Sequence, residues 1–108
     1  ELSRIEKIVA EPKSFLGKVL TPKELEKYHT LPFKRKVEFL AGRFAAKEAY
    51  AKALGTGIGQ HVSFQDIEVL NDATGKPVLV CERYSHQTWI SITHTSHDAY
   101  AVVVLESN

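Results

Sequence analysis

The chain has 108 residues, of which 44% are apolar and 25% are charged, a balance typical of a globular protein and a length that suits one domain over residues 1–108. No apolar run approaches the roughly 20 residues of a membrane span, and the single cysteine, Cys81, cannot form a disulfide within the chain; both features favour a cytoplasmic protein that does not enter a membrane.

The net charge of +1 is unevenly divided. Residues 1–52 carry 12 Lys/Arg and 7 Asp/Glu, a net of +5, whereas residues 53–108 carry 2 and 6, a net of −4. A basic half favours an anionic partner. Because aromatic side chains are not interleaved with these basic residues, we do not expect that partner to be a nucleic acid.

The first segments of the chain carry helix signals. Ser3 can cap a first helix and Pro12 can open a second. Thr21 precedes a proline and lies three residues before Glu24, which is the pattern of a capping box. We therefore expect three short helices, over residues 3–9, 12–17 and 21–28.

A long helix should run from Pro32 through Leu54, about 33 Å at ~1.5 Å per residue, and should end at a left-handed Gly55. Its apolar stripe consists of Val37, Leu40, Ala41, Phe44 and Ala45. Glu48 projects from the middle of this stripe. Because an isolated buried carboxylate is costly, we expect Glu48 either to hold a cation or to pair with Lys52 one turn later.

The second half of the chain changes to a strand pattern. We expect strands over residues 64–70, 77–81, 89–93 and 99–105, with the last two forming a hairpin. Helices followed by mostly antiparallel strands predict an α+β fold.

Three further groups could carry chemistry. The glycine-rich loop 55–59 lacks the Lys-Ser/Thr of a P-loop and follows a helix C-terminus, so by itself it is a flexible connector. Lys34-Arg35-Lys36 is either a solvated helix start or a polyanion site, since three cations oppose the dipole of a helix N-terminus. His94 and His97, even with His86, lack the further ligands of a zinc site.

Several motifs, in order, carry a family resemblance. Gly42 to Gly59 read Gly-Arg-Phe-Ala-Ala-Lys-Glu-Ala-Tyr-Ala-Lys-Ala-Leu-Gly-Thr-Gly-Ile-Gly. The other segments are Glu1-Leu2-Ser3-Arg4-Ile5, Phe64-Gln65-Asp66-Ile67, Gly75-Lys76-Pro77 and Ser91-Ile92-Thr93-His94-Thr95. Together they resemble the 4'-phosphopantetheinyl transferases, specifically the small bacterial holo-acyl-carrier-protein synthases.

The resemblance implies a subunit with a long central helix packed on a small antiparallel sheet, three such subunits forming a trimer with active sites at their interfaces. It implies transfer of 4'-phosphopantetheine from coenzyme A to a serine of apo-acyl carrier protein, with Mg²⁺ or Mn²⁺ as the metal. In the family the first motif carries an Asp three residues ahead of the position of Glu1, so we expect an N-terminally trimmed enzyme. A noncatalytic module that binds acyl carrier protein or coenzyme A is the alternative.

The resemblance also implies roles for individual residues. Glu48 would be a metal ligand and Lys52 would stabilise or protonate the leaving phosphate. Coenzyme A would be contacted by Lys34, Arg35, Arg43, Phe44, Gly55, Gly57 and Pro77, and by His94 and Thr95 of a neighbouring subunit. Arg4 would dock the acidic helix of acyl carrier protein. The general base stays open, because the upstream Asp is one candidate for it.

Overall fold

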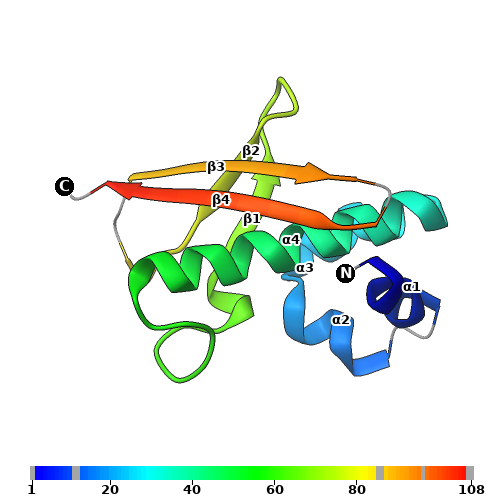
Figure 1. The fold of residues 1–108 in the computed structure, drawn as a ribbon, viewed down its shortest axis with the longest axis horizontal. Helices are drawn as coiled ribbons and strands as arrows, with labels where there is room; N and C mark the ends of the chain where they lie inside the picture. The colour runs from blue at the N-terminus through cyan, green and yellow to red at the C-terminus, as the bar shows by residue number, and fades with distance from the viewer. Residues whose placement is uncertain (1, 11–12, 85–86, 96, 107–108) are drawn as a thin grey trace.

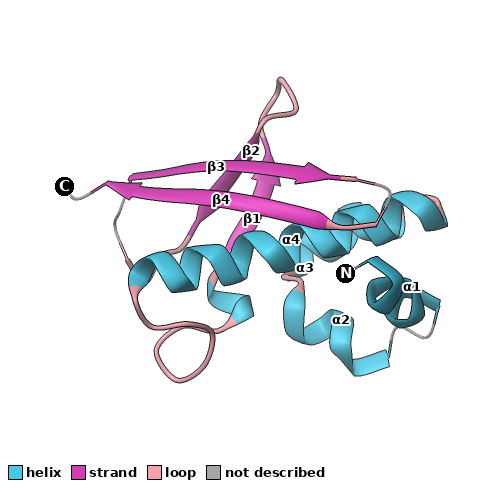
Figure 2. Cartoon of the chain, in the orientation of Figure 1, coloured by secondary structure: helices cyan, strands magenta, loops and turns pink. Residues whose placement is uncertain are grey.

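The computed structural model describes residues 2–10, 13–84, 87–95 and 97–106. Figure 1 shows an α+β arrangement in which a long helix lies along a β-hairpin, and Figure 2 shows the helices and strands in separate colours. The helices are α1 (Leu2–Ala10), α2 (Lys13–Val19), α3 (Pro22–His29) and α4 (Phe33–Leu54), with a 3₁₀ turn η1 at Phe64–Asp66. The strands are β1 (Glu68–Asn71), β2 (Pro77–Val80), β3 (Gln87–His94) and β4 (Ala99–Glu106). Glu1, Pro12 and His86 lie outside the described residues.

Helix α4 is the predicted long helix and organises the rest of the molecule. It ends at Gly55, whose φ of 87° is left-handed and whose N–H bonds to the carbonyls of Ala51 and Lys52. Gly42 brings the helix close to the hairpin, because a Cβ added there would lie 3.1 Å from Ile92 Cγ2. Glycine is therefore favoured at position 55 by the backbone conformation and at position 42 by the close packing.

The shorter helices cover one end of α4. The capping box predicted for α3 is present, with the Thr21 side chain accepting from the Glu24 N–H and the Glu24 carboxylate accepting from the Thr21 N–H. The predicted cap of the first helix is wrong. Helix α1 already begins at Leu2, whose N–H bonds to the His97 carbonyl, so Ser3 lies inside the first turn.

The four strands form two antiparallel pairs. In the predicted hairpin, β3 pairs with β4 from Gln87↔Glu106 to His94↔Ala99, and β1 pairs with β2 from Glu68↔Val80 to Asn71↔Pro77. Strand β2 also packs against β3. Figure 1 shows α4 running along one face of the β3–β4 hairpin, and β1 and β2 running diagonally to the two strands of the hairpin.

The strand predicted over residues 64–70 is wrong in its first half. Ser63 donates its backbone N–H to Asp66 Oδ2 at 2.8 Å, and Ile67 N–H bonds to the Phe64 carbonyl at 3.3 Å. These local bonds fold Phe64–Asp66 into a 3₁₀ turn, so pairing in the sheet begins only at Glu68.

Two apolar cores result. One lies among α1, α2, α3 and the first half of α4, around Leu20, Tyr28 and Leu40. The other lies between the second half of α4 and the strands, around Tyr50, Ile67 and Val69. Within the described residues, no helix has the length and hydropathy needed to cross a membrane.

Candidate active site

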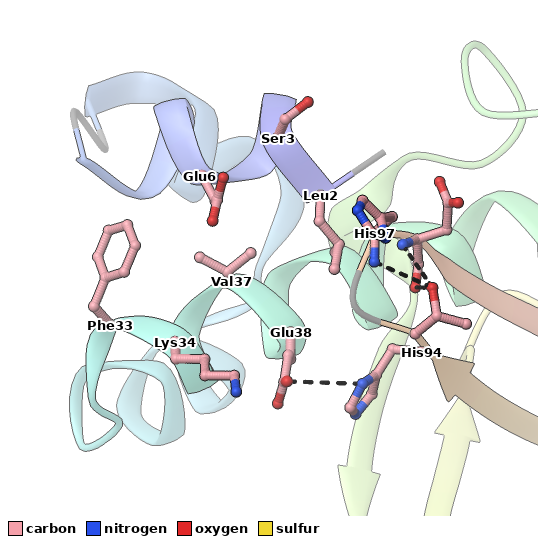
Figure 3. A pocket seen from close by; sticks show the side chains of 11 residues that line it. Leu2, Ser3, Glu6, Phe33, Lys34, Val37, Glu38, His94 and His97 are labelled. Atoms are coloured by element: carbon pink, nitrogen blue, oxygen red, sulfur yellow. Dashed lines mark hydrogen bonds and ion pairs between the residues drawn. The ribbon is translucent and has the colours of Figure 1, made fainter.

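A cavity of about 710 Å³ lies where α1, the start of α4 and the end of β3 meet. Figure 3 shows Lys34 and Glu38 of α4 facing His94 from the end of β3. Thr95 lines the same cavity. The fold thus brings together Lys34, His94 and Thr95, three residues predicted to bind phosphate, and it does so within one chain.

Glu38 lies between Arg35 and His94. Its Oε1 is 3.7 Å from Arg35 Nη1 and its Oε2 is 3.7 Å from His94 Nδ1. The Glu38 side chain is 18% exposed, whereas those of Arg35 and His94 are 69% and 43% exposed. The sequence motifs predict no role for Glu38.

A second cavity, of about 460 Å³, shares Glu38 and His94 with the first and adds Arg35, Arg43 and Pro77. This places four of the predicted coenzyme A contacts, Arg35, Arg43, Pro77 and His94, around one opening.

Arg43 is the most buried of these contacts, with 8% of the residue exposed. Its Nη2 donates to Asn71 Oδ1 at 2.9 Å, and its guanidinium lies 4.0 Å from the centre of the Phe39 ring. Nε is buried without a hydrogen-bond partner in the described part of the chain. Burial lowers the pKa of Arg43, an effect that the charge of Glu24 opposes.

Glu48 lines a third cavity, of about 240 Å³, together with Arg4 of α1 and Phe44. Glu48 is half-buried. Among the described residues it forms no ion pair with Lys52, so the helix salt bridge considered from the sequence is not formed. Phe44 stacks on Phe64 with ring centres 5.3 Å apart.

The donor set around Glu48 suits only certain metals. No group of three or more His, Cys, Asp or Glu side chains that could hold a metal occurs in the described ranges. A metal bound at Glu48 would therefore take most of its ligands from substrate oxygens and water. That is how Mg²⁺ is commonly held, through one or two carboxylates plus phosphate oxygens.

Lys52, Gly55 and Gly57 lie at the C-terminal end of α4, outside these three cavities. Lys52 is exposed. Gly55 and Gly57 have φ angles of 87° and 67°. At ~1.5 Å per residue, Lys34 and Lys52 are about 27 Å apart along the helix axis. Lys34 and Lys52 therefore lie near opposite ends of α4, whereas Arg43 of the second cavity precedes Glu48 by only one to two turns.

The structure also contains a buried ion pair that the sequence motifs do not predict. Lys47 Nζ lies 2.6 Å from Glu24 Oε1, and both side chains are 0% exposed. Nζ also donates to the carbonyls of Val19 at 2.6 Å and Phe64 at 3.1 Å, and Glu24 Oε2 accepts from Val69 N–H at 2.7 Å. The available signal was periodicity, because Lys47 lies seven residues after the buried Leu40.

Comparisons with known proteins identify the family of this chain. The pattern of the 4'-phosphopantetheinyl transferase superfamily matches residues 1–105. The chain belongs to this superfamily. The resemblance seen in the sequence is confirmed, and so is the α+β fold expected from it.

Individual members of the superfamily are similar in sequence to this chain over nearly its whole length. Holo-[acyl-carrier-protein] synthases of Lactobacillus johnsonii and Bacillus subtilis are 51% and 52% identical, with 98% of this chain and 89% and 88% of the relatives covered. A crystal structure of the Bacillus anthracis holo-(acyl-carrier-protein) synthase in complex with CoA (3',5'-ADP) matches with a TM-score of 0.93 and 51% identity, covering 100% of this chain and 90% of that one. A Helicobacter pylori holo-[acyl-carrier-protein] synthase in complex with coenzyme A matches with a TM-score of 0.83 and 36% identity, covering 97% and 93%.

Proposed function

We propose that this chain is a single-domain holo-acyl-carrier-protein synthase that transfers 4'-phosphopantetheine from coenzyme A to a serine of apo-acyl carrier protein and releases 3',5'-ADP. The observation that carries the proposal is the full-length match to a coenzyme A complex of such an enzyme, with 51% identity. A cytoplasmic location, favoured by the single cysteine, is part of the same proposal.

Coenzyme A binds with its 3'-phosphate in the basic cavity. Lys34 and Arg35 supply positive charge there, His94 supplies an imidazole N–H, and Thr95 supplies a hydroxyl donor. A guanidinium suits a phosphate because its planar fork makes paired hydrogen bonds. Arg43 and Pro77, at the neighbouring cavity, lie against the adenine end.

The reacting pyrophosphate binds near the second half of α4. The serine hydroxyl of the acceptor gives its proton to a general base and its oxygen attacks the phosphorus that carries the pantetheine arm, while the bond from that phosphorus to the departing 3',5'-ADP breaks. Glu48 would hold Mg²⁺, or Mn²⁺ in its place, which supplies charge neutralisation for the pyrophosphate. Lys52 stabilises the negative charge that develops on the leaving phosphate, Phe44 forms the wall beside Glu48, and Gly55 and Gly57 let the substrate arm pass close to the backbone.

Acyl carrier protein docks on α1. Arg4 is exposed on this helix and lines the cavity that contains Glu48. A cation at this edge would attract an acidic helix and bring its serine toward the reacting phosphorus.

The active site needs two chains. The 3'-phosphate and the pyrophosphate are attached to the same ribose, but within one chain Lys34 and Lys52 are separated by about 27 Å of helix. A second copy that places its basic cavity beside Glu48 closes this gap. The outer face of the hairpin is apolar and suits such an assembly, with Tyr100 58%, Val102 63% and Val104 50% exposed. We propose a homotrimer with three shared sites.

Incubation with coenzyme A, Mg²⁺ and apo-acyl carrier protein tests the proposed function. The intact mass of the carrier protein should rise by one phosphopantetheine group. Glu48→Gln should abolish this change and the Mg²⁺ dependence, yet leave the protein folded, because the amide keeps the volume and loses the charge. Coenzyme A or carrier-protein binding with no mass change by the unmodified protein would identify the noncatalytic module instead.

A further inference from the structure

Glu38 is a carboxylate at the point where an anionic ligand would be expected. It lines both neighbouring cavities and contacts Arg35 on one side and His94 on the other. Figure 3 shows its side chain directed at His94, with Lys34 on the preceding turn. We propose that Glu38 is an internal competitor that holds the phosphate-binding side chains of Arg35 and His94 when no ligand is present and weakens the binding of the 3'-phosphate. This inference rests on the proposed function.

The two contacts are loose enough to exchange. Both separations are 3.7 Å, longer than a charge-assisted hydrogen bond. Arg35 and His94 are substantially exposed and solvent-screened, so turning them toward a new partner costs little. Glu38 is only 18% exposed and stays in the wall. An arriving phosphate therefore gains the cations but remains beside the carboxylate.

A carboxylate near a bound phosphate opposes it by charge repulsion. For groups near a protein surface this repulsion is appreciable at several ångströms and is then reduced by solvent, which leaves a penalty of about tenfold in affinity. The penalty applies to the 3'-phosphate and so to both coenzyme A and 3',5'-ADP. Its benefit is faster release of the nucleotide product, a step that limits turnover in many enzymes.

The same arrangement determines discrimination between nucleotides. A ligand without the 3'-phosphate does not displace Glu38 from Arg35 and His94, and it is not repelled by the carboxylate at close range. Removing the charge of Glu38 should therefore strengthen binding of 3',5'-ADP much more than that of dephospho-coenzyme A. If Glu38 instead serves to hold Arg35 and His94 in position, the reverse is expected. Without the carboxylate these two side chains would be less well placed and would bind phosphate less tightly.

Isothermal titration with 3',5'-ADP and with dephospho-coenzyme A distinguishes these roles. Glu38→Gln should bind 3',5'-ADP about tenfold more tightly than the unmodified protein, with less than about a twofold change for dephospho-coenzyme A. Glu6→Gln is the matched control, since Glu6 lines the same cavity and neither Arg35 nor His94 contacts it in the described residues. It should change both affinities by less than about twofold.

Glu38→Ser serves as a second variant that also removes the charge, so a folding defect in one of them does not decide the result. Unchanged or weaker binding of 3',5'-ADP by the folded variants, or an equal gain for both ligands, would overturn the competitor role while leaving the proposed function intact. Failure of the unmodified protein to bind coenzyme A or 3',5'-ADP would instead overturn the proposed function, and the inference with it.

Discussion

Lys47 links α4 to three other elements. Its ammonium contacts α3 through Glu24, the end of α2 through the Val19 carbonyl, and η1 through the Phe64 carbonyl. Burial lowers the pKa of Lys47, and the nearby Glu24 carboxylate counteracts this. A buried pair of this kind adds little net stability compared with apolar side chains, but loss of one partner leaves a buried charge uncompensated.

Lys47→Met should therefore lower the free energy of unfolding by about 3 to 5 kcal/mol, because Glu24 would remain buried without its cation. Lys52→Met, the same substitution on the same helix at an exposed position, should change it by no more than about 0.5 kcal/mol. Chemical denaturation followed by circular dichroism measures both. Equal effects at the two positions would mean that the buried pair has no special importance.

Tyr50 gives the fold a sensitivity to alkaline conditions. Burial raises the pKa of its phenol above the ordinary value of 10.0, and a side-chain hydrogen bond with Cys81 raises it further. Above pH 10 the unfolded chain loses this proton and the folded chain keeps it, so stability present below pH 10 falls as pH rises. The slope should reach about 1.4 kcal/mol per pH unit for this one proton.

Stability measured from pH 8 to 11.5 should show this loss, and Tyr50→Phe should reduce it. The lowered pKa of Lys47 acts in the opposite direction below its ordinary 10.5, and for this reason the difference between the two proteins is the quantity to compare. Tyr100→Phe, at a position 58% exposed, is the control and should follow the unmodified protein. Identical profiles for Tyr50→Phe and the control would contradict this account.

At the scale of elements, two glycines make opposite demands on the backbone. Gly55 terminates α4 with φ of 87°, and an added Cβ would meet no atom within 4 Å. Gly17 lies inside α2 and is equally open. Gly55→Ala should therefore cost about 1 to 2 kcal/mol through left-handed backbone strain alone.

Gly17→Ala should instead stabilise the protein by about 0.5 to 1 kcal/mol, because alanine is the better helix former. Thermal unfolding of the two variants under identical conditions tests this pair. A loss of stability for both would show that packing, rather than backbone conformation, decides the outcome at these positions.

The helices and the hairpin could be predicted because their signals are local. A capping box at Thr21, a terminal glycine at Gly55 and two runs rich in strand-forming residues separated by a turn specify these elements without tertiary information. The first half of the strand predicted over 64–70 failed because a Ser63–Asp66 side-chain bond favours a turn over an apolar pattern.

The site was less accessible to prediction from the sequence. The family motifs gave the functional residues, and those assignments remain predictions. The place of Glu38 between Arg35 and His94 depends on how β3 lies against α4, and the partner of Lys47 lies 23 residues away on another helix. Neither contact has a spacing that the sequence alone reveals.

At the scale of the whole molecule, the separation between Lys34 and Lys52 makes a shared site testable. Glu48→Gln and His94→Ala should each be inactive alone, since each removes one half of every site. Mixed subunits should regain activity, because a site that takes Glu48 from one chain and His94 from the other is intact. Random trimers of the two should reach about a quarter of the unmodified rate.

The mixing should follow partial denaturation and refolding, so that subunits exchange, and turnover should be measured with coenzyme A and apo-acyl carrier protein. The control is a mixture of Glu48→Gln subunits and Lys52→Met subunits, because Glu48 and Lys52 belong to the same half of the site. This mixture should stay inactive. Restored activity in the control, or no activity in the test mixture, would contradict the proposal that Glu48 and Lys52 come from one chain and His94 from another.

Burial of Lys47 also has a chemical consequence. Amine acylation requires a neutral, accessible nitrogen, and its three contacts withhold the Lys47 nitrogen from reagents in solution. Among the lysines whose side chains are described, it alone is fully buried. Lys47 will therefore be labelled only when α4 separates from α3. Its acylation rate, read by peptide mass mapping, reports how often the interior opens while the exposed lysines react regardless.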